Sequence, residues 1–394
     1  MEKILIISNY YPPEKGAAAN RIEQLALQLL NNNYDVSVVC PLGNYPKGEL
    51  FNEYKGKFSV TENLKNIVVK RLWIYPSVSK NIFVRLVSTL SFSTSLFFYL
   101  LFAKIPKKVV VQSPPLLLSF ISVTLLSLQR KKIILNVSDL WPLAAIELNA
   151  LKKDSFSHKI SLFMEKFIYK KATVVLGQSN EIINHIKTIC PEKKCYLYQN
   201  FPKHDSNLFE LETIENQPIK IFYAGLLGVA QGVLSLCENI RIENLNIELH
   251  VFGDGFEKKL IQDLIDKTGN SKVFFYGMLD RNDLHQQLKK MDIAIVPLKT
   301  RIYGSVPSKI FEYTTLGFPV LYFGGGEGGN IVQKNNLGWI AEVGDFSELN
   351  NQINEIAKLS KNELHLKKKS VFEKSKQVFN LDIQMQKLLI EKVF

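Results

Sequence analysis

The segment formed by residues 303–329 constrains the fold of this chain more than any other part of the sequence. It follows a short apolar run, residues 292–298, which is typical of a buried parallel strand. Pro307 suits the first turn of a helix, and Gly317 suits the end of one. A second apolar run, residues 319–323, then leads into a glycine-rich loop. This order of strand, helix and strand predicts a parallel sheet covered by helices.

The same pattern of strand, turn and helix recurs along the chain. A chain of 394 residues is long enough for two domains, each with its own core. We therefore expect an α/β protein with two Rossmann-like, doubly wound domains, and a polar, acidic linker between them. Residues 44–70 are polar and aromatic, and we expect loops there. The further strands are expected at residues 4–8, 35–40, 108–112, 132–137, 172–177, 196–200, 220–224, 247–252, 272–276 and 337–343.

The formal net charge of +12 is compatible with nucleic acid, an anionic membrane surface or an anionic substrate as a partner. The lysines are spread along the chain and no aromatic RNA-binding motif is present, so we expect no nucleic acid. Residues 82–103 are almost continuously apolar, but they contain many serines and threonines. This segment is interpreted as a core helix, an interfacial helix or a membrane span, and the first of these is favoured.

Three residues at the start of the helix after residues 292–298 form a candidate anion site. Ser308 and Lys309 fall where free backbone N–H groups of a helix point outward, which favours phosphate. Glu312 lies one turn further along, where a carboxylate can accept hydrogen bonds from a ribose diol. The alternative is that Lys309 and Glu312 are an ordinary surface pair, which stabilises a protein only weakly.

Further candidates lie where expected strands end, since doubly wound folds bind ligands there. Gly16 follows the first strand, and Asp139 follows the strand at residues 132–137. Asp139 could instead cap the next helix. In the second half, Gly225 and Gly228 allow a backbone to approach a ligand closely.

Two strings carry a resemblance to a known family. DLWP at residues 139–142 and PSKIFEY at residues 307–313 resemble the GT4 class of retaining GT-B glycosyltransferases. The resemblance is closest to the branch that builds bacterial surface polysaccharides, which includes the N-acetylfucosamine transferases, and it extends over nearly the whole chain.

The resemblance implies a GT-B fold, in which two Rossmann-like domains face each other across a cleft. The acceptor-binding domain would span residues 1–204 and the linker residues 205–218. The nucleotide-sugar-binding domain would span residues 219–375, and a C-terminal helix, residues 376–394, would return to the first domain. It also makes Asp139 and Lys309 the catalytic candidates. The nucleotide-sugar-binding candidates are Gly16, Ala17, Arg21, Gly225, Gly228, Gly253, Gly277, Ser308, Lys309 and Glu312.

The sequence departs from the family pattern at several of its functional positions. Most relatives have two glutamates, and Glu312 matches the second, whereas the position of the first is Gly304. Leu227 and Gln231 stand where most relatives have an arginine and a lysine for the diphosphate. Asp139 stands where many relatives have a histidine. We therefore expect Lys309 and backbone amides to bind the diphosphate.

The resemblance implies transfer of a sugar from a nucleotide-sugar donor, with retention at the anomeric carbon. We favour a UDP-sugar donor and an undecaprenyl-diphosphate-linked saccharide acceptor, in capsule or O-antigen synthesis. The enzyme would act in the cytoplasm, peripherally on the inner face of the cell membrane. No cofactor is expected, and no metal, because the chain has no Asp-x-Asp pair.

Three rival functions remain open. Gly324, Gly326 and Gly329 fit a GxGxxG pattern, which would indicate a NAD-dependent oxidoreductase, but this pattern comes late in its domain. A GT-B epimerase would share the fold. A non-catalytic nucleotide-sugar-binding protein is the third, because the first glutamate and the basic residues of the phosphate loop are missing.

Overall fold

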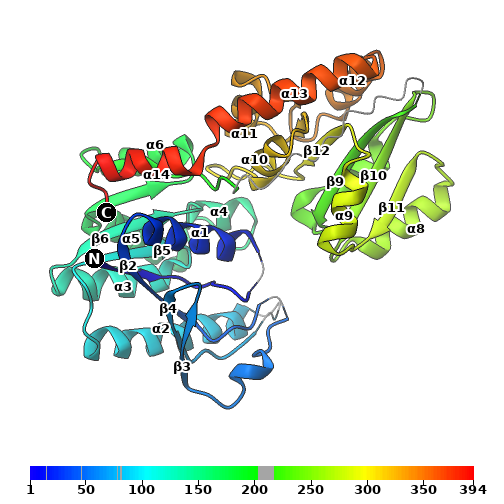
Figure 1. Ribbon diagram of the computed structural model, residues 1–394. Coiled ribbons are helices and arrows are strands. Elements are labelled where there is room, and N and C mark those ends of the chain that lie inside the picture. Colours follow the sequence, from blue (N-terminus) through cyan, green and yellow to red (C-terminus); the bar gives the residue numbers. More distant parts are fainter. Residues whose placement is uncertain (15, 46, 78, 80–81, 203–216) are drawn as a thin grey trace. The chain divides into compact units, whose positions relative to one another are not determined.

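The computed structural model describes residues 1–14, 16–45, 47–77, 79, 82–202 and 217–394, so nearly all of the expected linker, residues 205–218, lies outside the described residues. The chain divides into two compact units (Figure 1). The first unit comprises Met1–Gln199, Ile302–Ser305 and Asp382–Phe394, and the second comprises Asn200–Arg301 and Val306–Leu381.

Among the described residues, the sheet of the first unit has eight strands in the order β3-β4-β2-β1-β5-β6-β7-β8. All pairs are parallel except β3 with β4. The strand order reverses between β1 and β5, so ligands are expected beyond the carboxyl ends of these two strands. The strands are β1 (Glu2–Ile7), β2 (Tyr34–Pro41), β3 (Ser59–Leu64), β4 (Ile67–Leu72), β5 (Lys108–Ser113), β6 (Lys132–Val137), β7 (Val174–Gly177) and β8 (Cys195–Leu197).

The prediction of loops over residues 44–70 was wrong in its second half, where β3 and most of β4 form an edge hairpin. No residue of β3 is fully buried, so its sequence lacks the apolar run by which the buried strands were recognised. The hairpin matters for the site because β4 carries Arg71, whose side chain is fully buried.

Helices of the first unit build its main core against one face of the sheet. That core combines residues of α2, α3, α5 and α6 with alternate residues of the strands. The alternation follows from the period of two along a strand. The helices are α1 (Ala17–Asn31), the 3-10 helix η1 (Asn52–Tyr54), α2 (Ile82–Phe102), α3 (Leu116–Leu128), α4 (Leu143–Glu147), α5 (Phe156–Lys171), α6 (Asn180–Ile189) and α14 (Leu381–Ile390).

The C-terminal segment Asp382–Phe394 belongs to the first unit although it follows the second in sequence. Gln384 forms two hydrogen bonds with the backbone of Gln199, at 2.8 and 3.0 Å. Lys132 donates to the carbonyl of Lys392 at 2.7 Å. Met385 and Val393 are fully buried. The expectation that a terminal helix returns to the first domain is therefore confirmed.

The second unit has a parallel sheet, whose described strands follow the order β11-β10-β9-β12-β13-β14. This is the Rossmann order 3-2-1-4-5-6, which reverses between β9 and β12. Its strands are β9 (Ile219–Leu226), β10 (Ile247–Asp254), β11 (Val273–Gly277), β12 (Ile293–Pro297), β13 (Val320–Phe323) and β14 (Gly338–Ala341). Its helices are η2 (Val229–Gln231), α7 (Val233–Asn239), α8 (Lys258–Thr268), α9 (Arg281–Leu288), α10 (Ser308–Thr315), α11 (Gly326–Lys334), α12 (Phe346–Ala357) and α13 (Lys361–Val378).

Candidate functional site

The candidate site of the second unit lies where the strand order of its sheet reverses, between β9 and β12. Gly225 lies near the end of β9, Gly228 lies in the loop that follows, and the chain enters α10 after β12. The carboxyl ends of two neighbouring strands meet at one edge of the sheet, and the N-terminus of α10 follows there. A ligand at this edge would meet free N–H groups of the helix, which favour an anion.

Lys309 brings these two segments together. Its ammonium donates a hydrogen bond to the carbonyl of Ala224, at the end of β9, and another to Oη of Tyr313, 3.3 Å away. The same ammonium lies 5.3 Å from the ring centre of Tyr223 and 5.2 Å from that of Tyr313. An ammonium has three N–H groups, and the third has no partner among the described residues. Lys309 is therefore held in place with one donor left for a ligand.

The glycines beside Lys309 are there because no larger residue fits. A Cβ on Gly225 would collide with the Lys309 ammonium, and a Cβ on Gly253 would collide with the carbonyl of Gly225. Both glycines also have positive φ angles, 155° and 146°, which disfavour other residues. The two strand ends therefore pack closely, and the Lys309 ammonium occupies the space that a side chain at position 225 would take.

The remaining candidates of the second unit lie at different distances from this centre. Ser308 is the first residue of α10, and Glu312 lies one turn further with an exposed carboxylate that has no hydrogen-bond partner among the described residues. A Cβ on Gly228 would lie 2.7 Å from Oε1 of Gln231, so these two residues are close neighbours in the loop after β9. Gly277 ends β11, the edge strand, and a Cβ there would meet nothing within 4 Å.

The glycines of the GxGxxG pattern serve a different purpose. They surround the start of α11, which follows β13 rather than the first strand of the sheet. A Cβ on Gly324 would lie 2.7 Å from the Tyr322 hydroxyl, and a Cβ on Gly326 would collide with the guanidinium of Arg301. Because the pattern follows β13 rather than the first strand, it does not have the position of a dinucleotide fingerprint.

In the first unit, Arg21 and Asp139 belong to one polar cluster at the carboxyl ends of β6, β7 and β8, in which Arg21 is buried and Asp139 is half-buried. The guanidinium of Arg21 donates to Gln178 at 2.5 Å, to Asn136 at 2.8 Å and to the carbonyl of Tyr198 at 3.1 Å. Burial lowers the pKa of Arg21 to about 10, and the Tyr198 hydroxyl and the Asp139 carboxyl oppose this shift. These contacts use Nη1 and Nη2, whereas Nε is buried without a hydrogen-bond partner among the described residues.

Asp139 keeps its carboxyl in an environment that disfavours the charge. Burial raises its pKa, and this effect exceeds the opposing effects of Arg21 and of the Ser138 hydroxyl, which donates to Oδ2 at 3.3 Å. A carboxyl with a raised pKa holds its proton more readily than an exposed one, as general acids and bases often do.

Replacing Asp139 by Asn should make the stability of the protein less sensitive to pH. The folded pKa is raised, so the carboxyl favours folding below its unfolded pKa of about 3.9 and costs stability as the pH rises through the folded value. We therefore expect Asp139→Asn to melt at a higher temperature than the parent at pH 8, and at the same temperature near pH 4. Scanning calorimetry across this range measures both. Asp263→Asn, an exposed control, should show no such trend.

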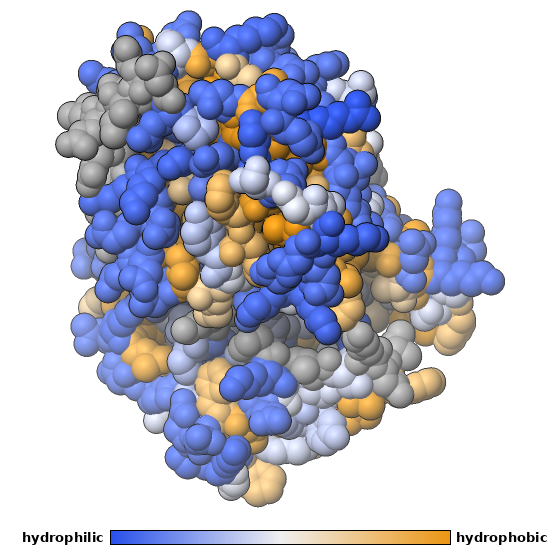
Figure 2. All heavy atoms as spheres, turned by 90° about the vertical axis from the view of Figure 1, so that its right-hand side faces the viewer, coloured by the Kyte–Doolittle hydropathy of each residue, from blue (hydrophilic) through white to orange (hydrophobic). Residues whose placement is uncertain are grey.

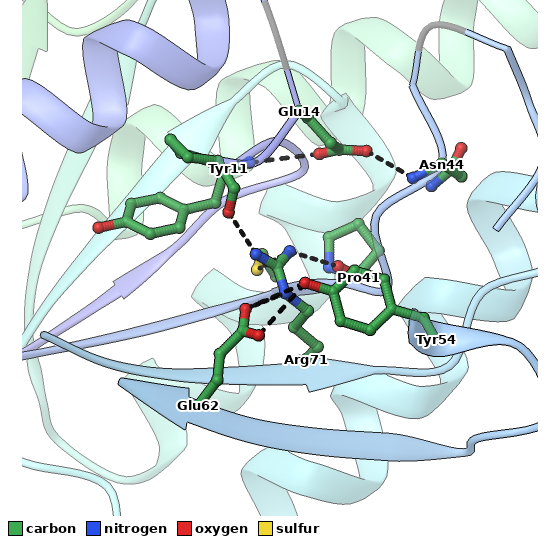
Figure 3. A network of polar contacts seen from close by, with 9 residues as sticks. Tyr11, Glu14, Pro41, Asn44, Tyr54, Glu62 and Arg71 are labelled. Atoms are coloured by element: carbon green, nitrogen blue, oxygen red, sulfur yellow. Dashed lines mark hydrogen bonds and ion pairs between the residues drawn. The ribbon is translucent and has the colours of Figure 1, made fainter. Parts of the chain in front are cut away.

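Gly16 and Ala17 open α1, and two buried side chains of the first unit hold the loop before them (Figure 3). Glu14 accepts hydrogen bonds from the backbone N–H groups of Tyr11, Asn44 and Tyr45, at 3.0–3.3 Å. Burial raises the pKa of Glu14. The loop after β1 is thereby attached to the loop after β2.

Arg71 also binds the loop after β1. It donates to the carbonyl of Pro12, to that of Pro41 at 3.4 Å and to Glu62 at 2.5 Å, and its guanidinium lies 5.0 Å from the ring centre of Tyr54 (Figure 3). Neither Glu14 nor Arg71 was predicted from the sequence. Their partners lie up to about sixty positions away, so no local pattern marks them.

The candidates come from both units. In the second unit, Gly225, Gly253, Ser308 and Lys309 lie around one strand edge, with Glu312 one turn beyond. Arg21 and Asp139 lie in the polar cluster of the first unit, and Gly16 and Ala17 begin a helix of that unit. Gly304 belongs to the first unit too, where its N–H donates to Glu181 at 2.7 Å and its carbonyl accepts from Ser179 at 2.7 Å. Among the described residues, no group of three His, Cys, Asp or Glu side chains could hold a metal ion.

Residues 205–371 match the family model described as "Glycosyl transferases group 1". This is the segment that contains the Lys309 site. No curated protein sequence matches the chain.

Solved structures resemble the chain over its whole length. Sucrose-phosphate synthase from Thermosynechococcus elongatus has a TM-score of 0.74 at 14% identity, covering 100% of this chain and 99% of its own. HepE from Anabaena, in complex with UDP and glucose, has a TM-score of 0.67 at 12% identity, covering 100% of both chains. WaaG, a glycosyltransferase involved in lipopolysaccharide biosynthesis, has a TM-score of 0.63 at 14% identity, covering 98% of both. At such identities the likeness shows the fold alone, and this fold is GT-B.

The predicted GT-B fold is thus confirmed, and the resemblance to group 1 glycosyltransferases is confirmed over residues 205–371. The narrower resemblance to the N-acetylfucosamine transferases stays a prediction.

Proposed function

We propose that the protein is a glycosyltransferase that moves a sugar from a nucleotide sugar to a hydroxyl of a glycan acceptor. The observation that carries this proposal is the position of Lys309. The Lys309 ammonium is held beside the N-terminus of α10, at the edge of the second sheet where the strand order reverses. This site lies inside the segment that matches group 1 glycosyltransferases. A diphosphate is the ligand that this arrangement suits best.

In this proposal the donor diphosphate binds to the free N–H of Lys309 and to the N-terminus of α10. Ser308 adds a hydroxyl, and Gly225 and Gly228 let the backbone approach the phosphates. The Glu312 carboxylate accepts hydrogen bonds from the ribose hydroxyls, and Gly253 and Gly277 border the nucleoside. We favour UDP, because HepE was solved in complex with UDP and a trehalose-6-phosphate structure with UDP-2-fluoro-glucose.

The chemistry would require little covalent participation by the protein. The bond between the anomeric carbon and the diphosphate breaks, and negative charge grows on the departing oxygen, where Lys309 stabilises it. The acceptor hydroxyl attacks from the face that the diphosphate leaves and gives its proton to the departing diphosphate oxygen, so the anomeric configuration is retained. Asp139 would act on the donor sugar or the acceptor hydroxyl from the first unit, with Arg21 tuning its charge, and Gly16 and Ala17 would border the ligand there.

For the acceptor we propose a saccharide linked to undecaprenyl diphosphate, at the cytoplasmic face of the cell membrane, in capsule or O-antigen synthesis. The support is the sequence resemblance to the surface-polysaccharide branch, together with structural likeness to WaaG. No cofactor takes part in this reaction scheme.

A thermal-shift series with UDP, GDP, ADP and CDP tests the donor site. A ligand at one hundred times its dissociation constant stabilises a protein by about 2.7 kcal/mol, so one nucleotide should raise the melting temperature above the others. Release of free nucleoside diphosphate in the presence of a lipid-linked acceptor then separates a transferase from an epimerase or a non-catalytic binder. The alternative of a non-catalytic binder gains support from Leu227, which is fully buried and cannot replace the missing basic residue of the phosphate loop.

Replacing Glu312 by Ala should weaken nucleotide binding. The loss of hydrogen bonds to a charged group should cost about 1–3 kcal/mol, or roughly a 5- to 150-fold rise in the dissociation constant. Titration calorimetry with the preferred nucleotide measures it. Glu373→Ala, an exposed glutamate on α13, is the matched control. An unchanged constant in Glu312→Ala would remove Glu312 from the site.

A further inference from the structure

The outer surface of the first unit carries an unusual concentration of exposed apolar side chains on two helices and the end of a third. One face of α2 packs into the core through Phe92, Leu96 and Leu100, each at most 1% exposed. The opposite face is also apolar, and it is open to solvent. We call the following set the apolar face: Phe83, Leu86, Val87, Leu90, Phe97, Phe98, Leu101 and Phe102 of α2, Leu128 of α3, and Phe156, Ile160, Leu162 and Phe163 of α5, all 38–83% exposed.

These helices form one layer. α3 packs against α2 on one side and α5 on the other. The side chain of Gln129 donates to the carbonyl of Leu100 at 2.8 Å, which joins the carboxyl ends of α3 and α2. Phe120 of α3 lies 6.2 and 5.1 Å, between ring centres, from Phe163 and Phe167 of α5. The exposed apolar side chains of α2 and α5 therefore lie on one layer of helices, with the partly buried Phe120 and Ile121 of α3 between the two helices.

Other parts of the surface differ from the apolar face. Hydrophilic residues dominate the side of the molecule drawn in Figure 2, where hydrophobic residues occur in small separate groups. Exposed apolar residues scattered in this way are normal for a soluble protein, whereas a contiguous apolar surface marks an interaction site.

Basic residues surround the apolar face. Each of α2, α3 and α5 leads into a parallel strand on the same side of the sheet, so their carboxyl ends lie along one edge. Within residues 82–171 a single acidic residue, Asp154, is exposed. The exposed basic residues of this region are Arg85, Lys104, Lys107, Arg130, Lys152, Lys153, Lys159, Lys166, Lys170 and Lys171. Cations at helix ends also stabilise the helix dipole, but that explains only those in the last turns.

We propose that this face is a docking surface for an anionic lipid bilayer, with the apolar side chains in the headgroup region and the basic residues on lipid phosphates. An apolar face rimmed by Lys and Arg is the pattern of interfacial helices, and each basic residue near an anionic membrane adds to the binding. A protein partner of matching character would need a large acidic and apolar surface, whereas an anionic bilayer offers both at once.

The surface lies on the membrane and α2 does not cross it. Phe83–Phe102 is long and apolar enough to span a membrane, and 22% of its apolar 18-residue stretch is buried. Insertion would withdraw Phe92, Leu96 and Leu100 from the core of the first unit, and it would expose the buried hydroxyl of Ser93 to hydrocarbon. The docking surface is independent of the transfer reaction, and it would place the first unit beside a lipid-linked acceptor.

Vesicle flotation with the full chain tests the proposal. We expect binding to phosphatidylglycerol–phosphatidylcholine vesicles at low salt, little binding to pure phosphatidylcholine, and release at high salt, because salt screens exposed charges. Lys170→Gln with Lys171→Gln should weaken binding about thirtyfold. The triple variant Phe102→Ser, Leu128→Ser and Phe156→Ser should weaken it at least tenfold. Phe58→Ser, 80% exposed elsewhere in the first unit, and Lys369→Gln with Lys376→Gln are the controls.

Four results would overturn the proposal: no binding to anionic vesicles at low salt, equal binding by the variants and the controls, binding that survives alkaline carbonate, and a dimer that the triple variant abolishes. The third would show an inserted helix, and the fourth would show a second copy of the chain on this face. Nucleotide-induced thermal shifts of the same variants should equal those of the parent, so failure of the lipid proposal is distinguishable from failure of the donor site.

Discussion

Lys309→Ala should lower turnover by about 10²–10³-fold, which corresponds to roughly 3–4 kcal/mol of transition-state stabilisation. Charge on the departing diphosphate is greater in the transition state than in the bound donor, so turnover should fall more than donor affinity. The fold should survive the change, because the Tyr313 hydroxyl also donates to the carbonyl of Ala224, at 2.6 Å. Steady-state release of nucleoside diphosphate at varied donor concentration gives both constants.

Lys334→Ala is the matched control for Lys309→Ala, since Lys334 is an exposed lysine of the same unit in the last turn of α11. It should leave turnover unchanged. Equal turnover in Lys309→Ala and the parent would contradict the assignment of Lys309 to the leaving group. A loss confined to the Michaelis constant would make Lys309 a residue that holds the ground state only.

Arg71→Met should lower the free energy of unfolding by about 3–5 kcal/mol, the usual cost of removing one partner from a buried ion pair. The methionine fills much of the space but leaves the carbonyls of Pro12 and Pro41 without this donor. It also leaves Glu62, whose side chain is 24% exposed, without its cation. Urea unfolding followed by circular dichroism measures the change.

Lys70→Met is the control for Arg71→Met, because Lys70 lies next in the chain and its ammonium donates to the hydroxyls of Ser59 and Thr61 at the surface. It should change the unfolding free energy by less than about 1 kcal/mol. Adding Glu62→Gln to Arg71→Met should restore part of the loss, since the uncompensated carboxylate is removed. A loss below 1 kcal/mol in Arg71→Met would mean that water replaces the guanidinium in this network.

Buried parallel strands were predictable because each is a continuous apolar run that ends at a turn. The second sheet illustrates this: β12 and β13 have no exposed residue, and both were placed from the sequence. β3 was not, because it exposes alternate residues and only Val60 and Leu64 of its three inward positions are apolar, so it has no continuous apolar run. Patterns of apolar residues locate the core of a fold, and they say little about an edge that faces water.

Some features of the candidate site were likewise predictable from the sequence, and others were not. Lys309 and Gly225 were predictable because a helix start and a strand end each carry a local signature. The contacts of the Lys309 ammonium with the carbonyl of Ala224 and with the ring of Tyr223 join positions about 85 residues apart. Such contacts depend on the order of strands in the sheet, which the pattern along the chain does not specify.

The return of Asp382–Phe394 to the first unit reverses the usual sequence of events during synthesis. Domains generally fold as units, with the N-terminal one first. Here every residue of the second unit has been translated before Asp382 is added, so that unit can be finished while the first still lacks a helix. Until this segment is made, the surface that Met385, Leu388 and Val393 later cover remains exposed. Synthesis of the segment, rather than emergence of the N-terminal half, is therefore the step after which the first unit can close its core.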